Sequence, residues 1–116
     1  MQFEIYGKDI LITEHLRGHI GRRLCFALGR FIRRIGRIRV SVGDLNGPRG
    51  GVDKLCRVSI KLTGSTTILT EDCDSDIYVA IDRAADKAGR CIARRLRRLK
   101  DSGQHKGVSD FSGTGV

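Results

Sequence analysis

The spacing of apolar residues predicts two helices in this chain. Between residues 77 and 99, isoleucine, alanine and leucine recur at steps of three and four, which places them on one side of a helix with about 3.6 residues per turn. This long helix should occupy residues 74–100, with Asp74 or Ser75 as its cap and Asp76 in its first turn. A second apolar stripe from Leu16 to Phe31 predicts a shorter helix after an N-cap at Thr13.

Alternating polar and apolar residues predict four strands. The alternation is visible in residues 2–6, 37–42 and 56–63, and a threonine-rich segment at residues 66–73 follows the turn signal Gly64-Ser65. The segment 46–53 contains three glycines and the single proline, so we expect a flexible connection there. The predicted order of elements is therefore β-α-β-β-β-α.

This order predicts an α+β domain. The first two strands are joined through a helix and should be parallel, whereas the later strands are joined by shorter loops and should be antiparallel. Because each strand has one mainly apolar side, we expect a four-stranded mixed sheet with two helices packed on one face. The domain should span residues 1–100, and the polar, glycine- and serine-rich segment 101–116 should be a flexible C-terminal tail.

Positive charge is concentrated on the two predicted helices. The net charge is +9, and residues 13–39 contain eight arginines against one glutamate, while residues 76–100 contain eight lysines and arginines against three aspartates. Two such surfaces on one side of a sheet predict a polyanionic partner such as RNA, DNA or an anionic membrane. Arginine predominates, and its planar fork suits phosphate. Charge placement alone selects Arg22, Arg30, Arg33, Arg97 and Arg98 as candidate RNA-binding residues.

Other reactive side chains favour structural roles over an active site. None of the four cysteines shows the spacing of a zinc site, and Cys56 falls on the apolar side of a strand, where a thiol is commonly buried. His15 and His19 lie one helical turn apart and could bridge a metal, but no third ligand is evident, so a solvated helix face is favoured. We therefore predict no metal, no cofactor and no catalytic residue.

Two acidic residues of the long helix could be mistaken for a catalytic pair. Asp82 and Asp86 are one turn apart, but each lies within one turn of Arg83, Lys87 or Arg90. Local ion pairs along the helix are therefore favoured over acid–base chemistry.

Two sequence blocks resemble the bacterial family of ribosome hibernation-promoting factors and ribosome-associated inhibitors, over about residues 1–100. They are the opening IxGxxIxIT at residues 5–13 and the block DxYxAIDxxxDK at residues 76–87. The resemblance implies a fold similar to a double-stranded-RNA-binding domain. It also implies binding to the small ribosomal subunit where messenger and transfer RNA sit, which keeps idle ribosomes inactive. Carried over position by position, it assigns contacts with ribosomal RNA to Arg23, Arg83, Lys87, Arg90 and Arg94.

The resemblance also sets expectations about partners. The expected partners are the small ribosomal subunit and its ribosomal RNA, with no small-molecule substrate and no membrane, for a cytoplasmic protein that is monomeric off the ribosome. The chain lacks the second domain of the long family members, so we do not expect it to pair ribosomes by itself. Two alternatives remain: a protein that binds another structured RNA through the same patch, and a membrane-surface protein attached through its basic helix. Against the second stands the absence of tryptophan.

Overall fold

The order of elements agrees with the prediction. A computed structural model describes residues 2–45, 53–64 and 66–105, so the connection predicted at residues 46–53 falls almost entirely outside the described residues, as does the end of the predicted tail. The elements are β1 (Gln2–Lys8), α1 (Glu14–Leu28), the 3-10 helix η1 (Gly29–Arg34), β2 (Ile35–Asp44), β3 (Lys54–Leu62), β4 (Thr67–Asp74) and α2 (Ile77–His105).

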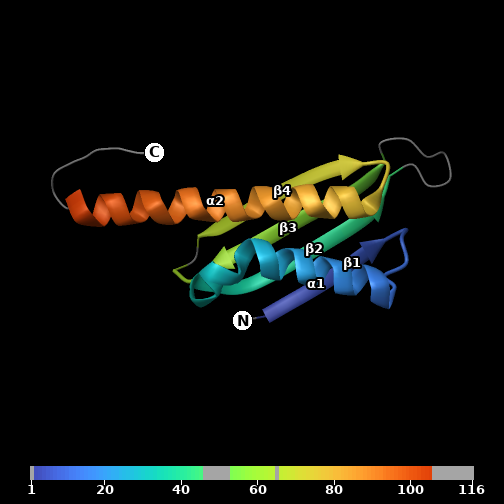
Figure 1. Cartoon of the computed structure of the whole chain (residues 1–116), viewed down its shortest axis with the longest axis horizontal. Coiled ribbons are helices and arrows are strands. Elements are labelled where there is room, and N and C mark those ends of the chain that lie inside the picture. The colour runs from blue at the N-terminus through green and yellow to red at the C-terminus, as the bar shows by residue number, and fades with distance from the viewer. Residues whose placement is uncertain (1, 46–52, 65, 106–116) are drawn as a thin grey trace.

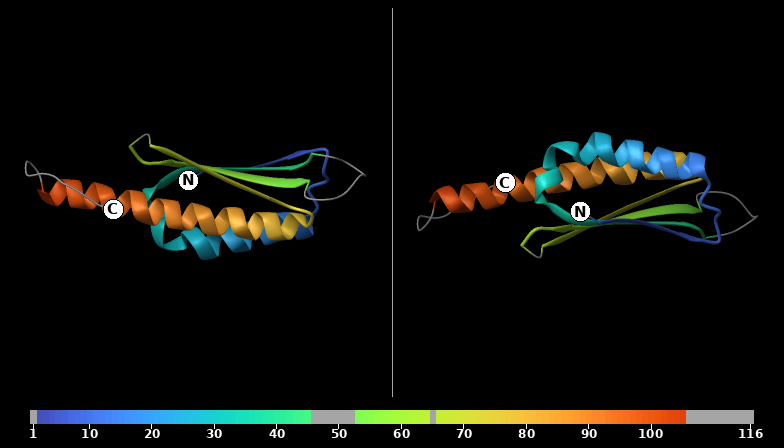
Figure 2. Two further views of the ribbon diagram at one scale, coloured as in Figure 1. Left: turned by 90° about the horizontal axis from the view of Figure 1, so that it is seen from above. Right: turned by 90° about the horizontal axis from the view of Figure 1, so that it is seen from below.

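The strands form one mixed sheet in the order β1-β2-β3-β4. β1 is parallel to β2, whereas β2–β3 and β3–β4 are antiparallel, as the connections predicted. Both helices cover the same face of this sheet, and the other face is open to solvent (Figure 2). The predicted α+β architecture is therefore confirmed.

The core lies between the sheet and the helix pair. α1 contributes one residue per turn, and α2 contributes small alanines together with two isoleucines, so the helices approach the sheet closely. Phe3 at the start of edge strand β1 remains 43% exposed, although it pairs with the buried Ile38 on the core side of the sheet. The buried helix residues are Leu16, Ile20, Leu24, Leu28, Ala80, Ile81, Ala84, Ala85, Ala88 and Ile92.

The first helix begins as predicted and ends earlier. The Thr13 hydroxyl accepts a hydrogen bond from the Leu16 amide at 3.1 Å, which confirms Thr13 as the N-cap. The α-helix stops at Leu28, and the chain continues as η1, where Phe31 is partly buried against the core. The apolar stripe thus crosses from an α-helix into a tighter helix without leaving the core.

The long helix starts and ends later than predicted. Its cap is Asp76, whose carboxylate accepts a hydrogen bond from the Tyr78 amide at 2.9 Å. The predicted cap at Asp74 or Ser75 is therefore wrong, and the Asp74 carboxylate instead accepts the Asp76 amide at 2.9 Å. α2 runs to His105, so the domain boundary predicted at residue 100 falls inside a helix.

Candidate nucleic-acid interface

The two helices lie side by side and run in the same direction (Figure 1). They are in close contact at Gly89, where an added Cβ would lie 2.9 Å from the carbonyl oxygen of Ala27 and 3.5 Å from the Ala27 Cβ. No larger residue fits without moving a helix, so glycine at this position allows the contact. The exposed sides of α1 and α2 therefore form one continuous surface.

A row of polar contacts joins α1 to the first half of α2. Nε2 of His19 lies 2.8 Å from Oδ1 of Asp82, and Arg23 contacts Asp82 at 3.1 Å and Asp86 at 2.9 Å. The prediction that these two carboxylates pair locally along α2 is wrong, because both bind side chains of α1. Arg23, which the family resemblance assigned to RNA, is thus already held by two carboxylates within the molecule.

Aromatic contacts continue this row toward the start of α2. The His19 ring meets the Tyr78 ring edge-on, with the two centroids 4.8 Å apart. The centroid of the His15 ring lies 5.6 Å from that of the Tyr78 ring. The predicted solvated face holds for His15, which is exposed, but not for His19, which is partly buried. In the part of the chain that the structure describes, no group of His, Cys, Asp and Glu residues could hold a metal ion.

Two of the predicted RNA contacts on α2 bind the edge strand β4. Arg83 lies 3.3 Å from the Asp74 carboxylate, and Lys87 lies 3.1 Å from the Asp72 carboxylate and donates to the Glu71 carbonyl at 3.1 Å. Partial burial by itself would raise the pKa of Asp72, but the hydrogen bonds from Lys87 and from the following amide outweigh it and lower that pKa. These cations hold α2 against the sheet.

Four other predicted cations meet at a groove between the helices. This interhelical groove has a volume of about 710 Å³, and the small residues Ala27, Gly89 and Ala93 line it. The single acidic residue in its lining, Asp86, is bound to Arg23. Four arginines line the groove without a carboxylate partner among the described side chains: Arg30 of η1, and Arg90, Arg94 and Arg97 of α2.

The remaining three predicted residues are exposed but lie outside the interhelical groove. Arg22 is on α1 and Arg33 on η1, whereas Arg98 lines a separate pocket on the β4 side of α2. The predicted set therefore divides into four groove arginines, three cations with carboxylate partners and three residues at other positions.

Phe26 is a groove residue that the sequence analysis missed. It is 81% exposed, and the Arg23 guanidinium lies 5.6 Å from the centroid of its ring. Its sequence signal was its position: Phe26 lies off the stripe of Leu24 and Leu28, so a helix must direct it away from the core. An exposed aromatic ring beside four arginines is suited to contact a nucleobase.

Comparison with known proteins identifies the family. Residues 3–101 match the model of the family described as sigma 54 modulation protein / S30EA ribosomal protein. The chain belongs to this family. Membership confirms the resemblance noted in the sequence and places this S30EA-family protein among ribosome-associated proteins. None of the curated proteins searched matches the sequence.

Solved structures show the same fold. A ribosomal subunit interface protein from Coxiella burnetii superposes with a TM-score of 0.71 at 19% identity, over 84% of this chain and 100% of that one. The N-terminal domain of Thermus thermophilus Protein Y superposes with a TM-score of 0.65 at 23% identity, over 82% of this chain and 99% of that one. In the described residues, no helix of this S30EA-family protein is both long and apolar enough to cross a membrane.

Proposed function

We propose that this protein binds the small ribosomal subunit at the messenger and transfer RNA sites and keeps idle ribosomes inactive. The observation that carries the proposal is the interhelical groove, where four arginines converge without a carboxylate partner among the described side chains. Family membership supports the ribosome as the target. The fold match to a protein named for the ribosomal subunit interface agrees with that location.

The chemistry of the groove suits the backbone of folded RNA. A guanidinium group donates paired hydrogen bonds to phosphate oxygens, and it remains charged at physiological pH. Folded RNA presents closely spaced phosphates that a protein reads by shape. The groove volume of about 710 Å³ leaves room for a sugar–phosphate strand between the arginine side chains.

The four groove arginines carry most of the proposed affinity. Arg23, Arg83 and Lys87 remain in the proposed surface, but each already has a carboxylate partner and would gain less from a phosphate. The ion pairs of Arg23 hold α1 against α2, and those of Arg83 and Lys87 hold α2 against β4. Arg22, Arg33 and Arg98 extend the basic surface around it.

Occupancy alone accounts for the proposed inhibition. A protein that fills the space of messenger and transfer RNA prevents both from binding, and no reaction is required. This role places the protein in the cytoplasm, bound to ribosomes when translation stops and monomeric when free.

Co-sedimentation with purified small subunits tests the proposal. The double variant Arg90→Glu/Arg94→Glu should lose binding at a salt concentration where the wild type sediments with the subunits. Lys8→Glu/Lys61→Glu is the matched control, because it changes the charge equally on the open face of the sheet.

Two further measurements complete this test. Messenger and transfer RNA should compete with the wild-type protein for the subunit. The proposal is refuted if the groove variant binds like wild type, or if an unrelated structured RNA binds as tightly as the small subunit does.

A further inference from the structure

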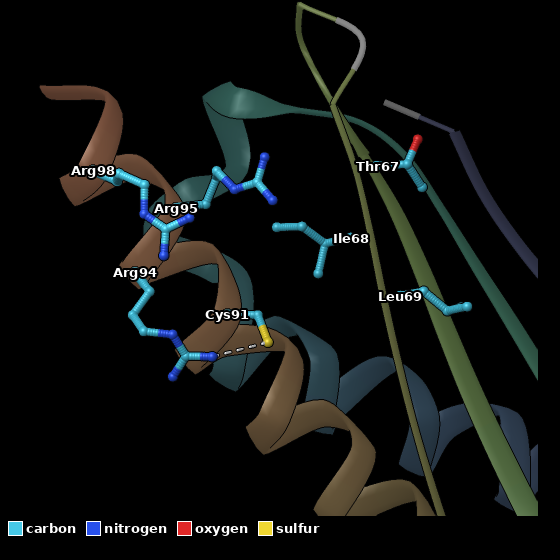
Figure 3. A pocket seen from close by; sticks show the side chains of 7 residues that line it. All are labelled: Thr67, Ile68, Leu69, Cys91, Arg94, Arg95 and Arg98. Carbon is cyan, nitrogen blue, oxygen red and sulfur yellow. Dashed lines mark hydrogen bonds between the residues drawn. The ribbon is translucent and has the colours of Figure 1, made fainter. Parts of the chain in front are cut away.

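A second basic pocket lies on the other side of α2, between this helix and the edge strand β4 (Figure 3). Its volume is about 240 Å³. Arg94, Arg95 and Arg98 reach it from α2, and the Ile68 side chain points toward it from β4 (Figure 3). We call this site the α2–β4 pocket. Its remaining lining residues are Thr67, Leu69 and Cys91.

Within the described residues, the charge of the α2–β4 pocket is not compensated. No described acidic residue lines the pocket, and its three guanidinium groups have no carboxylate partner among the described side chains. Among the described residues, Arg94 donates to a weak acceptor there, the Cys91 sulfur at 3.5 Å. Arg95 is partly buried, and withdrawing a cation from water without a partner is unfavourable, so an anion bound here would stabilise the pocket.

We propose that the α2–β4 pocket binds the phosphate chain of a small ligand, such as inorganic polyphosphate or the phosphates of a nucleotide. Three guanidinium forks match the oxygens of adjacent phosphate groups. β4 is the edge strand of the sheet, so half of its backbone amides have no partner strand on the outer side.

The size of the pocket favours a phosphate chain over a whole nucleotide. Its volume is below the range of about 300–1,000 Å³ that is usual for sites enclosing a drug-sized ligand. A neighbouring hollow of about 390 Å³ shares Leu69, Cys91 and Arg94 with it and would accommodate the rest of a larger ligand.

The α2–β4 pocket is distinct from the interhelical groove but communicates with it through one side chain. Arg94 lines both sites. A phosphate chain that holds Arg94 on the β4 side removes a donor from the groove, so the ligand would weaken RNA binding without occupying the groove. Binding of the ligand itself does not depend on the ribosome being the partner of the groove.

Cys91 allows a direct test because it lines the pocket. In a Cys25→Ser/Cys73→Ser background, the remaining thiols are Cys91 and Cys56. Cys56 is fully buried, and this burial raises the pKa of its thiol to about 12, so it does not react in the folded protein. The reaction rate with the uncharged reagent N-ethylmaleimide therefore reports on Cys91 alone.

Tripolyphosphate should slow this reaction in a saturable way, whereas sulfate at equal ionic strength should not. Arg95→Gln, in the same background, should raise the tripolyphosphate concentration needed for half-maximal protection about tenfold. This is the change expected for the loss of one charge-assisted contact. Arg98→Gln repeats the test at a second position. Arg17→Gln is the matched control: it removes one charge from exposed α1 surface and should leave protection intact.

The source of the phosphate is distinguished by a parallel measurement with a short RNA oligonucleotide. The proposal is supported if tripolyphosphate protects Cys91 and this protection is lost in Arg95→Gln, whether or not RNA also protects Cys91. Protection by RNA alone overturns it and assigns these arginines to the RNA interface. Equal rates with and without tripolyphosphate, or protection that survives both substitutions, also overturn it.

Discussion

Replacing Arg97 with glutamine should flatten the salt dependence of RNA binding. Arg97 lines the interhelical groove and neither of the two hollows on the β4 side of α2, so its loss tests the groove alone. Glutamine keeps part of the aliphatic stem and removes the charge. Arg97 has no carboxylate partner among the described side chains, so replacing it breaks no ion pair among them.

The magnitude follows from the number of groove arginines. Each phosphate that a protein neutralises contributes between about −0.7 and −0.9 to the slope of log K against log salt concentration. Four arginines that each meet one phosphate give a slope of about −3, which is a loss of about 60-fold in affinity between about 50 and about 200 mM salt. With three arginines left, the slope should be about −2.3, and the loss should be about 25-fold.

Fluorescence anisotropy of the labelled protein, titrated with small ribosomal subunits at several potassium chloride concentrations, measures both slopes. Lys61→Gln on the opposite face of the sheet is the control and should retain the wild-type slope. If Arg97→Gln keeps that slope too, or if Lys61→Gln flattens it equally, the groove is not where phosphates bind and the reasoning fails.

Three other predictions concern packing, stacking and a buried thiol. Gly89→Ala should reduce the free energy of unfolding by about 1–3 kcal/mol in urea denaturation, because its Cβ would meet the Ala27 carbonyl at 2.9 Å. Phe26→Ala should change stability by less than about 0.5 kcal/mol. It should nevertheless weaken RNA binding by about 1–3 kcal/mol if a base stacks on the ring. Cys56 should resist N-ethylmaleimide at pH 9 in the folded protein and react in urea, since burial raises the pKa of its thiol from 9.0 to about 12.

Each of these predictions has an outcome that contradicts it. Wild-type stability of Gly89→Ala would mean that the helices can separate without cost. Phe26→Trp would be the sole tryptophan, and fluorescence that RNA leaves unchanged would exclude stacking there. For Cys56, the folded state holds the proton to higher pH than the unfolded chain does, so its contribution to stability is complete below pH 9 and is lost as pH rises toward 12. Rapid labelling of folded protein would refute this burial.

The sequence by itself determined the elements, their order and the faces they bury. Apolar period and polar alternation are local properties of the chain, and short connections restrict how neighbouring strands can pair. Charge along the helices likewise indicated a basic surface without any knowledge of coordinates. Family membership agrees with the two sequence blocks at residues 5–13 and 76–87, both of which lie inside the matched range.

Only the tertiary structure decided which basic residues converge without a carboxylate partner among the described side chains. The register of α1 against α2, set where Gly89 meets Ala27, pairs Asp82 and Asp86 with side chains of α1. The arginines of the later turns of α2 then have no carboxylate partner among the described side chains. Contacts between segments about 63 residues apart depend on how two surfaces dock, and no local pattern encodes that register. The same docking separates the interhelical groove from the α2–β4 pocket, because two faces of one helix meet different neighbours.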